Sequence, residues 1–242
     1  MVSKVIEDSI KLLVSGSTGK MGQSISETLV QRLNEGHSFY KILEIVPFDS
    51  IENKEICESS IILDFSKASF SLKILKQAVT KKIPMIIGTT GFDEEQHETI
   101  KEASKQIPLI LAPNTSLGIT VLKEMLYAVK NHLNSHKFEI IEKHHKDKKD
   151  LPSGTSKDIA KFIENNLHSE KISIESIRED ESAGEHTVSL LSEDEMLTIS
   201  HKVTNRSVYS RGALLAAVWL DGMREFPGLY KMSDIYVPFE ED

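Results

Sequence analysis

The chain has 242 residues, of which 39% are apolar, and a formal net charge of −8 at pH 7 with a pI near 5.6. This length can hold one large domain or two modest ones, and the acidic balance disfavours binding to nucleic acid or to an anionic membrane. No apolar run approaches the roughly 18 residues needed to cross a bilayer, and the single cysteine, Cys57, cannot form an internal disulfide, so we expect a cytoplasmic protein.

The first 115 residues alternate between short apolar runs and helical stretches. Strands are expected at 10–14, 42–46, 61–66, 85–88 and 109–112, and helices after residue 22 and over 68–80 and 93–106. Strands that alternate with helices form parallel βαβ units. The pattern therefore predicts an α/β fold of the Rossmann type, with a doubly wound parallel sheet.

The pattern changes after residue 115. A helix over 121–132 and a strand over 138–142 are followed by a helix that begins near Thr155, and then by strands at 172–178, 185–191 and 195–201. Strands with little helix between them favour a mixed or antiparallel sheet. The last helical stretch, 212–223, is apolar on more than one face and could pack back on the first domain. We expect a dinucleotide-binding domain over 1–115, completed by 207–242, and an α+β domain over 116–206.

A glycine-rich turn follows the first expected strand. Glycines at 16, 19 and 22 allow a sharp turn into a helix and close approach of a pyrophosphate to the backbone, and the helix N-terminus offers N–H groups to phosphates. A tight turn that binds nothing remains an alternative, because Thr18 replaces the second glycine of the commoner G-x-G-x-x-G motif. The candidate cofactor residues in this turn are Gly16, Ser17, Thr18, Gly19, Lys20 and Met21.

Two later strand ends carry small polar residues at the same edge of the sheet, where open α/β sheets bind ligands. These further cofactor candidates are Gly88, Thr89, Thr90, Ala112, Pro113, Asn114 and Thr115. Asp49 or, less well placed, Glu44 is the candidate for the adenosine ribose. No arginine or lysine directly follows Asp49, which favours NADH over NADPH, although both stay open.

A basic run at 143–150 interrupts the acidic background with four lysines and two histidines. Pro152 and Gly154 predict a turn before a helix in which Thr155 and Asp158 fit a capping box. An anion at this helix start could accept N–H groups of the turn and charge-assisted hydrogen bonds from the basic run. A solvated surface loop is the alternative. No carboxylate or cysteine stands at convincing spacing for a metal site, so we expect none.

The segment 142–155 resembles the signature E-x-H-H-x-x-K-x-D-x-P-S-G-T of the dihydrodipicolinate reductase (4-hydroxy-tetrahydrodipicolinate reductase) family, and every fixed position matches. The glycine turn, the loops at 88–91 and 112–114, and the segments 184–188 and 201–213 resemble further landmarks of that family in the same order. The resemblance implies reduction of 4-hydroxy-tetrahydrodipicolinate to tetrahydrodipicolinate by NADH or NADPH, in lysine and diaminopimelate biosynthesis.

The resemblance also implies roles for individual residues and an assembly. His144 is the proton donor or acceptor and Lys148 the second acid–base residue. The implied substrate-binding residues are His145, Ser153, Gly154, Thr155 and Arg206. Such enzymes are homotetramers that assemble through the sheet of the second domain. Another amino-acid or semialdehyde dehydrogenase, or a non-catalytic nucleotide sensor, would explain the glycine turn but not the basic run.

Overall fold

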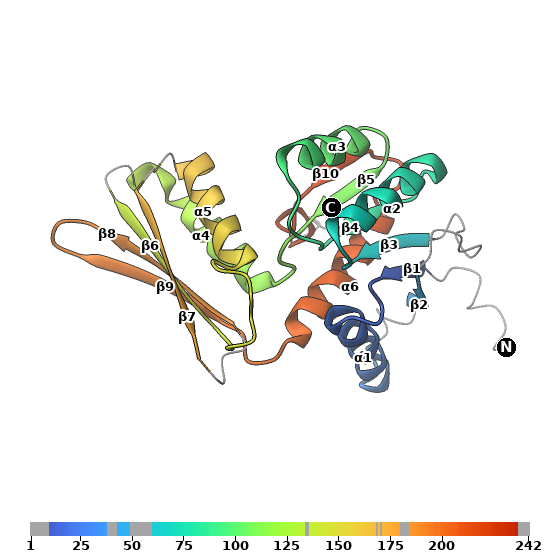
Figure 1. The fold of residues 1–242 in the computed structure, drawn as a ribbon, viewed down its shortest axis with the longest axis horizontal. Helices are drawn as coiled ribbons and strands as arrows, with labels where there is room; N and C mark the ends of the chain where they lie inside the picture. Colours follow the sequence, from blue (N-terminus) through green and yellow to red (C-terminus); the bar gives the residue numbers. More distant parts are fainter. Residues whose placement is uncertain are drawn as a thin grey trace, which may run out of the picture. The chain divides into compact units, whose positions relative to one another are not determined.

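The structure is a computed structural model that describes residues 10–37, 43–48, 60–133, 136–167, 169, 171–179 and 184–236. The chain divides into two compact units (Figure 1). The first contains Met1–Thr115 and Tyr209–Asp242, and the second contains Ser116–Val208. No helix in the described ranges is long and apolar enough to cross a membrane.

A six-stranded parallel sheet forms the centre of the first unit. Its strands are β1 (Ile10–Ser15), β2 (Leu43–Pro47), β3 (Ser60–Asp64), β4 (Met85–Ile87), β5 (Pro108–Leu111) and β10 (Gly228–Tyr230), in the order β10-β5-β4-β3-β1-β2. The first five match the predicted strands. β10 was not predicted, because a run of three residues is too short to show a period and finds its place only beside β5.

Helices cover both faces of this sheet (Figure 1). They are α1 (Lys20–Asn34), α2 (Ala68–Lys81), α3 (Glu94–Ser104) and α6 (Ser207–Asp221). One apolar cluster joins α1 and α6 to one face, and a second joins α2 and α3 to the other. The predicted doubly wound fold is confirmed. The part of α6 from Ala213 to Leu220 packs in the first cluster, as expected from its apolar faces, but the helix begins five residues earlier than predicted.

The second unit is a mixed four-stranded sheet with helices on one face (Figure 1). Its elements are α4 (Leu117–Ala128), β6 (Lys137–His144), α5 (Gly154–Leu167), β7 (Ile172–Arg178), β8 (Glu185–Leu191) and β9 (Met196–Lys202). The order is β7-β6-β8-β9, with β6 parallel to β7 and the other pairs antiparallel. The mixed sheet agrees with the prediction, whereas α4 begins four residues earlier than expected.

Two short 3-10 helices complete the described elements. One, η2 (Lys130–His132), follows α4, so the expected helix over 121–132 is in fact an α-helix that ends at Ala128 and a separate turn. The other, η3 (Asp234–Tyr236), lies near the end of the described chain. Helix ends commonly tighten in this way, and a periodicity of apolar residues does not detect it.

Candidate active site

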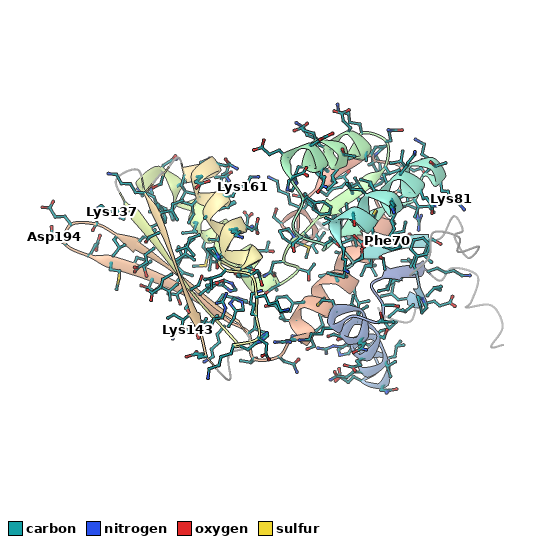
Figure 2. The ribbon with its side chains drawn as sticks, viewed as in Figure 1. Phe70, Lys81, Lys137, Lys143, Lys161 and Asp194 are labelled. Atoms are coloured by element: carbon teal, nitrogen blue, oxygen red, sulfur yellow. The ribbon has the colours of Figure 1, made fainter. Side chains whose placement is uncertain are left out.

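The buried face of strand β6 is apolar in its first half and polar toward its carboxyl end. Alternate residues of a strand lie on the same face, and Phe138, Ile140, Glu142 and His144 are all buried on the face toward α4 and α5. Strand β6 runs through His144, two residues beyond its predicted end, and Figure 2 labels Lys137 and Lys143 near its two ends. The regular alternation of β6 therefore brings a carboxylate and an imidazole to the edge of the core.

Glu142 is fully buried, and its charge is stabilised by hydrogen bonds. The backbone N–H of Ser153 donates to both carboxylate oxygens at 3.1 Å, and the hydroxyl of Ser156 donates to Oε2 at 2.8 Å. Arg178 Nη2 donates to Oε1 at 3.0 Å. Burial alone would raise the pKa of Glu142, but hydrogen bonds from Ser153, Ser176, Ser156 and Arg178 outweigh it and lower this pKa to about 2. Glu142 is therefore ionised at neutral pH.

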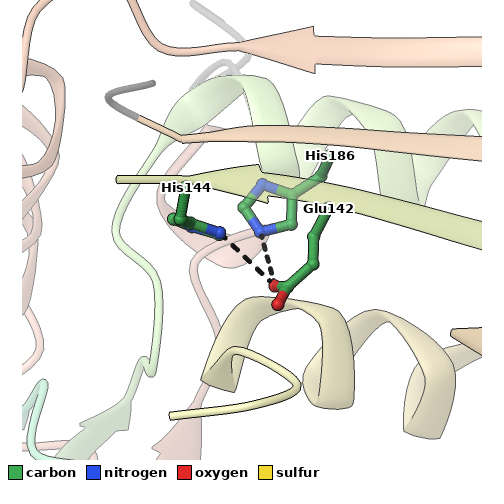
Figure 3. Close-up of side chains that lie close together, drawn as sticks. All are labelled: Glu142, His144 and His186. Carbon is green, nitrogen blue, oxygen red and sulfur yellow. Dashed lines mark ion pairs between the residues drawn. The ribbon is translucent and has the colours of Figure 1, made fainter. Parts of the chain in front are cut away.

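Two histidines lie against this carboxylate (Figure 3). His144 Nδ1 is 3.5 Å and His186 Nε2 is 4.0 Å from Glu142 Oε2, and the two rings meet edge to face at 5.0 Å. Strand register explains His186, because β8 places it directly opposite Glu142. His186 lies within the segment 184–188 that resembles a landmark of the family, but no role was predicted for it.

Both histidines are neutral at pH 7. Burial is the main cause and lowers the pKa of His144 to about 4 and that of His186 to about 3. The charge of Glu142 raises the pKa of both, but not enough to offset burial. The charges of Lys148 and Arg178 also lower the pKa of His144, but burial has the larger effect.

Ser153 connects the histidine cluster to the start of α5. Its hydroxyl accepts the backbone N–H of Ser156 at 3.1 Å, which caps the helix, and lies 3.3 Å from His186 Nε2. The predicted capping box of Thr155 and Asp158 is wrong. The helix begins one residue earlier, at Gly154, and the carboxylate of Asp158 pairs instead with Lys123.

The ammonium of Lys148 lies in the turn before α5. Its Nζ is 2.8 Å from Asp150 Oδ1 and 2.9 Å from Oδ2, and the same Oδ2 accepts the backbone N–H of Gly154 at 3.3 Å. Asp150 is exposed. What burial it has raises its pKa, but the hydrogen bond and charge of Lys148, together with backbone hydrogen bonds, lower this pKa on balance. Lys148 and the helix start thus already hold one carboxylate. His145 lies in the same loop, with Nδ1 4.0 Å from Asp147.

Arg178 belongs to the cluster although no motif pointed to it. It lies directly opposite His144 in the β6–β7 register. By contrast Arg206, which the resemblance implied, is exposed between β9 and α6, and within the described ranges no hydrogen bond or ion pair links it to these residues.

Glu142, His144 and His186 are spaced as a group that could hold a metal ion, with ligand atoms within 4.8 Å of one another. The carboxylate, however, already accepts several hydrogen bonds, and the Arg178 guanidinium touches it. A second cation at this place would face the repulsion of Arg178. The geometry is therefore better suited to holding protons than to holding a metal.

The glycine turn in the first unit fits a dinucleotide phosphate. A Cβ on Gly22 would lie 2.4 Å from Ser17 Cα, and one on Gly16 would lie 2.5 Å from the carbonyl oxygen of Phe65, so both positions require glycine. Gly19 begins α1 without a side-chain cap, and the first turn of α1 contains no acidic residue. Residues 18–20 are exposed at this helix start, which leaves its dipole accessible to an anion.

The turn lies at the topological switch point of the sheet, between β1 and β3. There, the buried Asp64 accepts hydrogen bonds from Thr89 Oγ1 at 2.7 Å and from Ser66 Oγ at 2.5 Å. Gly88 lies against the Phe65 ring, where a Cβ would approach to 2.1 Å. The ends of β3 and β4 are thus held together by these contacts, and Asp64 is a further candidate residue at this edge of the sheet that no sequence motif indicated.

The remaining cofactor candidates have mixed positions. The hydroxyl of Thr115 is buried and donates to the Tyr209 carbonyl at 2.7 Å, so this side chain anchors the start of α6 within the first unit. Glu44 is exposed on β2, opposite Lys11. Asp49, the preferred ribose candidate, lies outside the described residues.

Two family models match the chain. The model described as dihydrodipicolinate reductase, N-terminus, matches residues 10–115, and the one described as dihydrodipicolinate reductase, C-terminus, matches 118–236. A 4-hydroxy-tetrahydrodipicolinate reductase from Buchnera aphidicola subsp. Cinara cedri is 34% identical over 269 residues, covering 95% of this chain and 98% of that protein. Another from Caldanaerobacter subterraneus is 35% identical over 253 residues, covering 93% and 98%.

A solved structure shares the fold at lower sequence similarity. It is the dipicolinate-bound dihydrodipicolinate reductase from Paenisporosarcina sp. TG-14, with a TM-score of 0.70 and 20% identity over 92% of this chain and 97% of that one. GenD2 from gentamicin A biosynthesis, solved in complex with NAD, has a TM-score of 0.62 at 8% identity over 95% of this chain and 91% of that one. These two similarities concern the fold alone.

Proposed function

The chain belongs to the dihydrodipicolinate reductase family, and we propose that it reduces 4-hydroxy-tetrahydrodipicolinate to tetrahydrodipicolinate through His144 and Lys148. The observation that carries this proposal is the cluster around Glu142. A buried carboxylate, a neutral imidazole and an ammonium converge there beside a helix N-terminus. This set can bind a dianion and move protons.

The first step for the protein is to hold the substrate carboxylates. In the free protein the Asp150 carboxylate accepts hydrogen bonds from the Lys148 ammonium and from the backbone N–H of Gly154. A substrate carboxylate that replaces Asp150 gains the same donors and the dipole of α5. His145, Ser153, Thr155 and Arg206 are proposed to complete carboxylate binding, and the contacts of Arg206 would form only with substrate present.

The second step is proton transfer. A reduced nicotinamide, if bound at the glycine turn, would supply a hydride to the unsaturated ring formed when the substrate loses water. The product also requires a proton, and Lys148 carries transferable protons on its ammonium. His144 is neutral at pH 7, because burial lowers its pKa to about 4, so it acts first as an acceptor. A bound dianion raises that pKa and allows the ring to return a proton.

We propose that the first unit is the dinucleotide domain and the second the substrate and tetramerisation domain. The cofactor is NADH or NADPH, held at the glycine turn. The lack of a basic residue directly after Asp49 favours NADH. We place the enzyme in the cytoplasm.

A homotetramer would use the open face of the β7-β6-β8-β9 sheet. This face lies opposite α4 and α5. It carries paired hydroxyl groups, with Thr187 bonded to Ser200 at 2.9 Å and Ser189 to Thr198 at 3.2 Å, and a pair of opposite charges, Glu185 and Lys202, at 3.7 Å. Met196, 62% exposed, continues it along the edge strand. Such a face, which combines hydroxyl groups, an exposed apolar side chain and paired charges, suits contact with another copy.

The test follows absorbance at 340 nm with purified protein, NADH or NADPH, and substrate made in situ from pyruvate and aspartate semialdehyde by a coupling synthase. Oxidation that requires both this protein and the synthase is the expected result, and the two nucleotides are ranked in the same assay. Nucleotide binding without oxidation would reject the reductase function and favour a sensor or another dehydrogenase.

A further inference from the structure

The ion pair between the buried Glu142 and the partly buried Arg178 contacts both residues proposed to carry the chemistry, the ring of His144 and the backbone of Lys148. We propose that Glu142 and Arg178 are the positioning residues of the site: Glu142 orients the His144 ring, and Arg178 holds the backbone of the loop that carries Lys148. This inference rests on the proposed function, because it assigns a role to residues that act through His144 and Lys148.

The guanidinium of Arg178 donates hydrogen bonds to three acceptors: the Glu142 carboxylate and two backbone carbonyls. Nη2 donates to Glu142 Oε1 at 3.0 Å and to the carbonyl oxygen of Asp150 at 2.7 Å, while Nε donates to the carbonyl oxygen of Lys148 at 3.4 Å. The two carbonyls belong to the loop between β6 and α5. A planar guanidinium can make these divergent bonds together, whereas a lysine ammonium cannot copy the geometry.

Glu142 in turn restricts the orientation and the tautomer of the His144 ring. Its Oε2 lies 3.5 Å from Nδ1 of the imidazole and also accepts the Ser156 hydroxyl. A carboxylate beside Nδ1 favours the tautomer that carries its proton there, which leaves Nε2 as the proton acceptor. The tautomer decides which of the two ring nitrogens of a neutral histidine can accept a proton from a ligand.

Both constraints depend on the same ion pair between Glu142 and Arg178. We argue that this pair does more than stabilise the fold. Burying a carboxylate and a guanidinium costs several kcal/mol each in desolvation, and well-packed apolar residues can replace such a pair without loss of stability. The cost is compensated here by donors from β7, from the turn before α5 and from α5 itself. These are the elements that must stay in register for His144 and Lys148 to act together.

Glu142→Gln gives a defined test of the orientation, since Arg178 also fixes how the new amide would lie. Arg178 and the Ser153 N–H both donate to Oε1, so the amide oxygen should stay there and the NH₂ should replace Oε2, facing His144 Nδ1. A donor at that position repels the Nδ1–H tautomer. We expect ¹⁵N NMR to find the His144 proton on Nδ1 in the wild type and on Nε2 in Glu142→Gln.

Arg178→Lys tests the loop and keeps the charge. We expect kcat to fall on the order of 10- to 100-fold, as for small misplacements of reacting groups, while binding of NADH stays unchanged. The matched control is Arg224→Lys in the first unit, since Arg224 also combines an ion pair, with Asp221 at 2.7 Å, with bonds to a backbone carbonyl, that of Ser60. It should keep its kcat.

These experiments distinguish failure of the proposed function from failure of the positioning role. Wild-type protein without turnover rejects the proposed function. Active wild type with an unchanged His144 tautomer in Glu142→Gln, or with equal kcat in Arg178→Lys, overturns the positioning role. Equal losses of kcat in Arg178→Lys and Arg224→Lys also overturn it, because they would reflect a general loss of structure. If Glu142→Gln does not fold, the Arg178→Lys comparison still decides the question for the loop.

Discussion

At the scale of single residues, hydrogen bonds fix the charge of Glu142 and burial keeps His144 neutral. Glu142 and His144 are two positions apart on one strand, yet the carboxylate is charged and the imidazole neutral at pH 7. The difference is that Glu142 receives hydrogen bonds from several donors, whereas no hydrogen bond supports a charge on His144 Nδ1. Residue type already favours these states at pH 7, and the local environment strengthens both by lowering the two pKa values further.

Lys148→Ala should lower turnover by about 10²- to 10⁴-fold, the usual contribution of a positioned acid–base group. The fold should survive, because the side chain lies in a surface turn and loses only its pairing with Asp150. The control is Lys149→Ala, which removes an equal charge from the adjacent exposed position. Steady-state kinetics with thermal unfolding check this, and equal activity of the two variants would contradict an acid–base role for Lys148.

At the scale of elements, strand alternation and helix starts position both sites. Strand β6 delivers Glu142 and His144 to one face by its period of two, and α5 begins where Ser153 caps it. In the first unit, α1 begins at a turn that only glycines permit. Each site thus combines the carboxyl end of a strand with the N-terminus of the next helix.

Gly22→Ala should abolish or strongly weaken NADH binding. The new methyl group would lie within 2.5 Å of the Gly16 carbonyl oxygen, so the turn must open, at a cost of about 1–3 kcal/mol in unfolding free energy. Gly222→Ala is the control, because its Cβ would lie 3.4 Å from the Trp219 carbonyl oxygen, an ordinary contact. NADH fluorescence measures the binding, and an unimpaired Gly22→Ala variant would place the nucleotide elsewhere.

At the scale of the whole molecule, the buried histidines couple stability to pH. His144 and His186 have pKa values of about 4 and about 3, against an ordinary 6.5, so below pH 6.5 the unfolded chain binds protons that the folded chain does not. The free energy of unfolding should therefore fall as pH falls from 6.5, on the order of 1 kcal/mol per histidine and pH unit. Below 4.5, Glu142, with its pKa lowered to about 2, should add to the loss.

Urea unfolding between pH 7 and 4.5 measures this dependence. His186→Gln should reduce the slope, whereas the exposed His132→Gln should leave it unchanged. A free energy of unfolding that is constant between pH 7 and 5 would mean that the two histidines are not buried as the structure has them.

Assembly is the second property of the whole molecule. If four chains of 27.2 kDa assemble through the open face of the second sheet, Ser200→Arg should split the tetramer, because it adds charges where copies meet. Lys161→Glu on the exposed surface of α5 is the control and should not change the mass. Light scattering distinguishes the two, and a tetramer that tolerates Ser200→Arg would exclude this face.

Local patterns were sufficient for the parts of the protein that depend on nearby residues. The period of apolar residues predicted the doubly wound sheet and the mixed second sheet, and both are confirmed. The signature at 142–155 indicated the family, which is also confirmed; the catalytic roles of its residues stay a prediction. Glycine spacing located the sharp turn before α1 because backbone sterics act over a few residues.

Contacts between distant segments were decided only by the tertiary structure. Arg178 and His186 reach Glu142 through strand register, and β10 exists because β5 offers it an edge. The helix cap went to Ser153, not Thr155, because the buried carboxylate of Glu142 draws the Ser153 N–H into the turn. Register and burial depend on residues far apart in the chain, so no local pattern contains them.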